Sequence, residues 1–98
     1  MVTVPVAIDR VQAALSALTA RGETIEDEWQ YVTDLEAAWR TRLEEVASAR
    51  GGEPVPSHVE TALERVSAEA ESIEDPHRAI DWMSTLPQVA LLALGEAP

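Results

Sequence analysis

The chain has 98 residues, enough for one domain, and its 46% share of hydrophobic residues excludes a disordered acidic tail. Eighteen acidic residues stand against seven arginines and no lysine, and the resulting formal net charge of −11 repels nucleic acid phosphates and anionic membranes. There is no cysteine, which excludes a disulfide framework, a thiolate nucleophile and Cys-ligated zinc or iron–sulfur sites.

Hydropathy indicates neither a membrane protein nor a secreted one. No segment reaches the roughly 18 consecutive apolar residues that a membrane span needs. Residues 1–10 lack the positive leader and apolar core of a secretory signal. We therefore expect a cytoplasmic protein that binds neither membranes nor nucleic acid.

The first predicted helix covers residues 5–21. Pro5 suits its first turn, and Gly22 is placed to end it. A single apolar stripe with spacings of 3, 4 and 3 runs along it: Ile8, Val11, Leu15 and Leu18. Because the link that follows is short, the next helix should be its antiparallel neighbour.

The longest uninterrupted helical pattern runs over residues 24–50 and contains no Gly or Pro. Thr24 and Asp27 form a capping-box pattern at its start. At the other end, Arg50 suits the last turn and Gly51 can adopt the left-handed conformation that ends a helix. The sequence thus predicts a long amphipathic helix around which the shorter ones are arranged.

One face of this long helix is apolar, with a single exception. The predicted buried stripe comprises Ile25, Trp29, Val32, Leu35, Trp39, Leu43 and Val46. Glu36 lies inside that stripe, where a carboxylate is costly unless it is paired. It could act as a general acid or base, contact a ligand, or set the register of an interface. The structural alternative, which we favour, is an ion pair with Arg40 four residues later.

Residues 51–56 contain two glycines and two prolines and predict a loop. A third helix is expected over residues 57–74, opened by a capping box of Ser57 with Glu60. Glu60 and Glu64 are a like-charge pair four residues apart, which is mildly destabilising. The buried stripe of this helix should be Val59, Leu63, Val66, Ala70 and Ile73.

The C-terminal quarter predicts two short helices. Asp75 can cap a helix over residues 76–85 with Pro76 at its first position. Pro87 then opens a last helix over residues 87–94, although a continuous helix kinked at Pro87 is an alternative.

Residues 89–94, VALLAL, are apolar all the way round, and such a helix must be buried on most sides. Either this segment is the central plug of the fold, or it docks against a second subunit. The pattern favours neither.

Residues that could hold a metal or a cofactor are few. Ferritin-like di-metal sites need Glu-x-x-His pairs on helices. The one match, Glu74 with His77, straddles Pro76 and loses the required geometry, and His58 has no partner at ligand spacing. We predict no catalytic residue, no metal and no cofactor. The three tryptophans could line an apolar pocket, but in a small bundle they are more often core residues.

These observations predict an all-α protein, a bundle of four or five helices in one domain. The leading hypothesis for its function is a non-catalytic protein–protein interaction or assembly module acting as a homodimer. A small-molecule or metal-binding bundle is the alternative, and an acidic mimic of nucleic acid is a weaker one. The candidate interface or pocket residues are Trp29, Glu36, Trp39, Arg40, Trp82, Val89, Leu91, Leu92 and Leu94.

Overall fold

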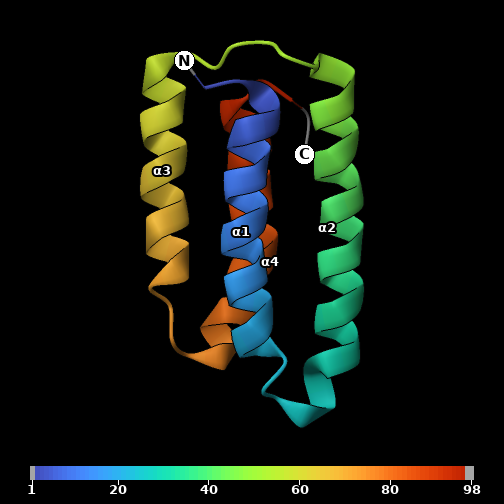
Figure 1. Ribbon diagram of the computed structural model, residues 1–98. Coiled ribbons are helices and arrows are strands. Elements are labelled where there is room, and N and C mark those ends of the chain that lie inside the picture. The colour runs from blue at the N-terminus through green and yellow to red at the C-terminus, as the bar shows by residue number, and fades with distance from the viewer. Residues whose placement is uncertain (1, 97–98) are drawn as a thin grey trace.

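The chain forms an all-α bundle, as expected. In the computed structural model, which describes residues 2–96, the elements are α1 (Val4–Gly22), the 3-10 turn η1 (Glu26–Glu28), α2 (Trp29–Arg50), α3 (Ser57–Glu71) and α4 (Pro76–Ala93). The helices run alternately down and up the molecule, so that α1 is parallel to α3 and antiparallel to α2 and α4 (Figure 1). The bundle measures 40 × 23 × 18 Å.

The centre of the bundle is the α1–α4 pair. Each of these two helices packs against the other and against both α2 and α3, which flank the pair on opposite sides (Figure 1). α2 is the longest of the helices in residues 2–96, as predicted, but it lies at the side of the molecule rather than at its centre. Its inner face is narrow, because only Val32, Leu43 and Val46 are buried.

The composition of α1 and α4 explains why they form the centre. The predicted stripe of α1 is fully buried, and small residues beside it allow neighbouring helices to approach closely. The buried residues of α1 include Val4, Ala7, Ile8, Val11, Ala14, Leu15 and Leu18, and those of α4 include Ala79, Met83, Leu86, Ala90 and Leu91. Burial of these apolar faces is the main driving force for the fold.

The start of the long helix differs from the prediction. The Thr24 hydroxyl donates to the backbone oxygen of Arg21 at 2.7 Å, so it satisfies the end of α1 instead of capping α2. The chain turns here, with the Ile25 amide donating to the Gly22 oxygen at 3.2 Å, before η1 leads into α2 at Trp29. The predicted capping box is therefore wrong, because the same hydroxyl is used by the preceding helix.

The connection from α2 to α3 crosses the top of the bundle (Figure 1). Gly51 ends α2 as predicted, with a positive φ of +55°. Its ψ of −133° lies outside the left-handed helical region, so the predicted left-handed conformation is wrong. Beyond it, the loop pairs with the N-terminal residues: the Val4 amide donates to the Glu53 oxygen, and the Val55 amide to the Val2 oxygen, both at 2.8 Å. This pairing places α3 beside α1 rather than beside α2.

The beginning of α3 also differs from expectation. Pro56 occupies the N-cap position, Ser57 is already helical, and no side chain caps the helix. The capping box predicted for Ser57 and Glu60 is therefore wrong. The helix ends at Glu71, three residues before the predicted limit, and the buried Ile73 follows it in the turn.

α4 is one continuous helix. Asp75 caps it as predicted, accepting a hydrogen bond from the His77 amide at 3.0 Å. The predicted break at Pro87 is wrong, since the helix continues to Ala93 with Pro87 buried inside it. Proline removes one backbone donor, but burial of Leu86 and Leu91 on either side holds the helix together across that gap.

Within residues 2–96, no helix combines the length and the apolar run needed to cross a bilayer.

Candidate interaction surfaces

Glu36 is paired. Its Oε1 lies 3.3 Å from Nε of Arg40, and the two side chains are 25% and 33% exposed. Arg40 also donates to the hydroxyl of Ser16 on α1. The carboxylate thus lies at the edge of the α1–α2 seam with its charge partnered, which is the alternative that we favoured from the sequence. Through Arg40, this ion pair is joined to α1 as well as to α2.

The three tryptophans have different environments. Trp39 and Trp82 are partly buried and pack against the core. Trp29, which the stripe placed inside, is 52% exposed, and Tyr31 beside it is 53% exposed. The placement of Trp29 in the buried stripe is therefore wrong. The reason is that Trp29 is the first residue of α2, directly after the η1 turn at the end of the bundle, where α1 has already ended.

The apolar segment 89–94 divides between core and surface. Leu91 is fully buried and Leu94 is 8% exposed, so both belong to the core of their own chain. Val89 and Leu92 point outward and are 36% and 61% exposed. The segment is therefore neither a plug buried on all sides nor wholly a docking surface. One face of α4 completes the core, and the other leaves two apolar side chains in solvent.

A hollow of about 350 Å³ lies at the end of the bundle where the 51–56 loop meets the ends of α2 and α4. Its lining includes Leu94 and also Arg50, Val55 and His58. Arg50 is held there by three acceptors: the two Glu53 carboxylate oxygens at 2.6 and 3.2 Å and the Leu94 backbone oxygen at 2.5 Å. The hydrogen bonds between Arg50 and Glu53 raise the pKa of Arg50 and lower the pKa of the Glu53 carboxyl.

Neither Glu36 nor any tryptophan lines this hollow or three others on the surface of residues 2–96. The candidate residues predicted from the sequence are therefore not brought together in any of these four hollows. Arg50 was expected only to suit the end of α2, and its bond to Leu94, 44 residues away, had no local signal in the sequence.

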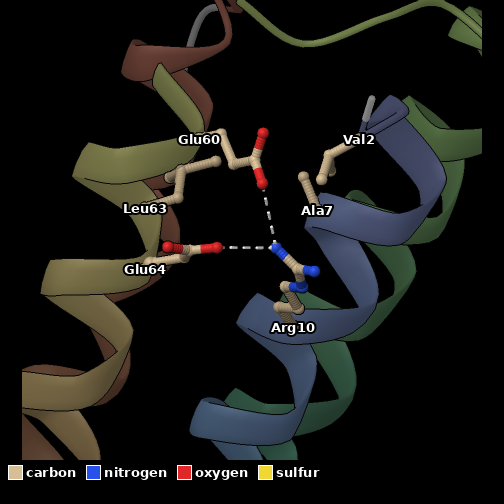
Figure 2. Close-up of a pocket in the computed structure, with 6 residues that line it drawn as sticks. All are labelled: Val2, Ala7, Arg10, Glu60, Leu63 and Glu64. Carbon is tan, nitrogen blue, oxygen red and sulfur yellow. Dashed lines mark hydrogen bonds and ion pairs between the residues drawn. The ribbon is translucent and has the colours of Figure 1, made fainter. Parts of the chain in front are cut away.

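A group of ion pairs lies between α1 and α3. Figure 2 shows Arg10 of α1 reaching two carboxylates of α3, with its Nη1 at 3.0 Å from Glu64 and 3.6 Å from Glu60. The cavity beside them is only about 10 Å³, room for a single water molecule. The like-charge pair seen in the sequence is thus neutralised in part by an arginine from another helix. That partner was not predicted.

We expect Arg10→Gln to lower the free energy of unfolding by up to ~1 kcal/mol at low salt, because the ion pairs are half-exposed and Glu60 and Glu64 would then repel each other. Urea unfolding at low and at high sodium chloride measures this difference, which should shrink as salt screens the charges. Arg78→Gln is the control, since Arg78 is exposed and makes no ion pair among residues 2–96. Equal losses in the two variants would contradict this role for Arg10.

In the described part of the chain, no group of three or more His, Asp or Glu side chains is gathered as a metal site requires. His58 and His77 are both exposed. No protein-family model matches the chain, and no curated protein and no solved structure matches it either. The exposed residues of the chain are therefore what bears on its function.

Proposed function

We propose that this protein is a non-catalytic interaction module that associates as a homodimer through the outer face of α4. The observation that carries the proposal is the exposure of Leu92 and Val89, at 61% and 36%. The inner face of α4 is already occupied by the core of the same chain. The exposed parts of these two side chains gain no free energy from the core, and contact with another surface would bury them.

The charge of this face supports a second copy of the same chain as its partner. Two chains of net charge −11 repel each other, so a self-association surface must be locally neutral. The exposed residues of α4 meet that condition, because the charges of Arg78 and Asp81 balance and no other Arg, Lys, Asp or Glu is exposed on this helix. The exposed face is made of His77, Arg78, Asp81, Thr85, Gln88, Val89 and Leu92. The outer face of α2, by contrast, exposes Asp34, Glu44 and Glu45.

The strength of the dimer follows from its area. A stable interface buries about 800 Å² on each partner, roughly a seventh of the 5380 Å² surface of this molecule. Two exposed apolar side chains on one helix supply only part of that. We therefore expect weak association, with a dissociation constant in the micromolar range or above.

Sedimentation velocity from about 10 µM to about 1 mM tests this proposal. We expect a concentration-dependent dimer that Leu92→Glu abolishes, because the variant places two like charges on the two-fold interface. Thr85→Glu, which adds the same charge two turns away on the same face, should weaken the dimer less. A wild-type chain that remains monomeric at the highest concentration would refute the homodimer.

The other functional hypotheses have less support. Glu36 and the tryptophans do not meet in a cavity among the hollows described above, which removes the arrangement that suggested a small-molecule or metal-binding bundle. The acidic outer face of α2 is the surface that a nucleic acid mimic would use, and competition with a DNA-binding protein is its test. The proposal keeps the cytoplasmic location expected from the sequence.

A further inference from the structure

A second surface lies at the other end of the molecule from Leu92. Here η1 and the first turns of α2 expose two aromatic side chains among carboxylates (Figure 1 shows this end at the foot of α2). We define the acidic–aromatic end by its exposed residues: Glu26, Asp27, Trp29, Tyr31 and Asp34. Two of the four aromatic residues of the chain, Trp29 and Tyr31, are thus about half exposed at this end of the molecule.

Charge decides what this surface can bind. From residue 22 to residue 39 the sequence has six acidic residues and no Arg or Lys. Glu36 is paired with Arg40, but Glu26 and Asp27 make no ion pair with any residue of the described chain. The carboxylate of Asp34 accepts one hydrogen bond at 3.0 Å, from the side-chain amide of Gln30. The exposed carboxylates of Glu26 and Asp27, which precede Trp29 by three and two residues, are therefore available to a cationic partner.

We propose that the acidic–aromatic end docks an arginine-bearing segment of another protein. A guanidinium group stacks on an indole or phenol face and at the same time donates to a carboxylate, which a lysine ammonium does less well because it is a compact and strongly hydrated charge. Trp and Tyr are also the side chains that most often anchor protein interfaces. Trp29 and Tyr31 lie on the two flanks of α2, with Gln30 and Asp34 between them, so a segment that crosses the helix meets both rings.

A second copy of this chain is a poor occupant of this surface. It brings a net charge of −11 toward a surface that is itself acidic, and its neutral face is the one proposed above for self-association. The inference extends the proposed interaction function but uses residues at the opposite end of the molecule. The two can therefore fail independently.

The test is a titration with labelled synthetic peptides, followed by fluorescence anisotropy at low salt. Three peptides of one length carry Arg, Lys or Gln at every third position among alanines. We expect affinity to fall in the order Arg, Lys, Gln. The double variant Trp29→Ala with Tyr31→Ala should bind the Arg peptide at least tenfold more weakly while circular dichroism shows that it stays folded, because neither side chain belongs to the buried core.

Matched charge variants separate specific docking from general attraction between a polycation and an acidic protein. Glu26→Gln with Asp34→Asn and Glu44→Gln with Glu45→Gln each remove two negative charges from η1–α2. The first pair should weaken binding severalfold and the second less than twofold. Equal effects of the two pairs, or equal binding of the Arg and Lys peptides, would overturn the proposal. Loss of self-association in the Trp29–Tyr31 variant would assign the surface to a second copy and overturn it too.

Leu92→Glu distinguishes this inference from the proposed homodimer. A monomeric Leu92→Glu protein should bind the Arg peptide as tightly as the wild type does. If the wild type proves monomeric and still binds that peptide, the homodimer fails and the docking surface stands. If it forms a dimer but does not prefer the Arg peptide, the docking surface fails and the homodimer stands.

Discussion

Leu15→Ala is expected to lower the free energy of unfolding by about 2–5 kcal/mol, the largest effect of any substitution considered for this chain. Leu15 is fully buried in α1, the helix that contacts all the others. Its truncation removes three carbons from the core and leaves a cavity that rigid neighbouring helices cannot close. A domain of this size has a total stability of about 5–15 kcal/mol, so the variant should lose a large part of it.

Thermal and urea unfolding followed by circular dichroism measure this loss. At about 4–8 °C per kcal/mol for a domain of this length, the melting temperature should fall by at least ~8 °C. Leu92→Ala is the matched control, because it makes the same chemical change on a side chain that is 61% exposed. We expect a change within about 0.5 kcal/mol there. Similar losses in the two variants would mean that the α1 face is not the core.

The inner faces of the helices could be predicted from the sequence because they depend on local spacing alone. Ile8, Val11, Leu15 and Leu18 recur at the helical period, and all four are buried. The same rule placed Val32, Leu43 and Val46 on the inner side of α2. It failed for Trp29, since a helical stripe says which side faces inward but not whether a neighbouring helix extends far enough to cover it.

Helix limits were predicted less well because the signals that mark them can serve more than one element. The Thr24 hydroxyl can cap the helix that follows or bind the carbonyl of the helix that precedes, and the sequence does not decide between them. Pro87 carries a strong local signal for a break, yet the burial of its own ring and of Leu86 and Leu91 outweighs the lost hydrogen bond. In both places tertiary structure overrides a local preference.

The candidate sites depended on partners that are distant in the sequence. Glu36 and Arg40 are four residues apart, and their pairing was foreseen. Arg10 meets Glu64 across 54 positions and Arg50 meets Leu94 across 44, and no local pattern indicates either contact. The exposed face of α4 was predicted in part. The sequence shows that residues 89–94 are apolar, but only the fold shows that Leu91 is buried and Leu92 is exposed.

Arg50→Ala is expected to lower the free energy of unfolding by about 1–3 kcal/mol. The Arg50 side chain is 23% exposed and donates to both oxygens of Glu53 and to the Leu94 carbonyl, so it joins the end of α2 to the loop and to the end of α4. Arg50→Lys should lose most of the same free energy, because one ammonium cannot reach three acceptors in this geometry. Urea unfolding measures the loss of stability in both variants. Arg65→Ala is the control, because Arg65 is an exposed residue of α3.

The pH dependence of the same unfolding experiment isolates the Glu53 part of this contact. Arg50 donates hydrogen bonds to Glu53 and so lowers the pKa of its carboxyl below the ordinary value of 4.5. A carboxyl with a lowered pKa stabilises the folded state fully above pH 4.5. That contribution disappears as the pH falls through the lowered pKa. The wild type should therefore be more stable than Glu53→Gln at neutral pH, and the two should converge in acid. A difference that persists undiminished to low pH would mean that the carboxylate charge contributes nothing and that the contact acts through packing alone.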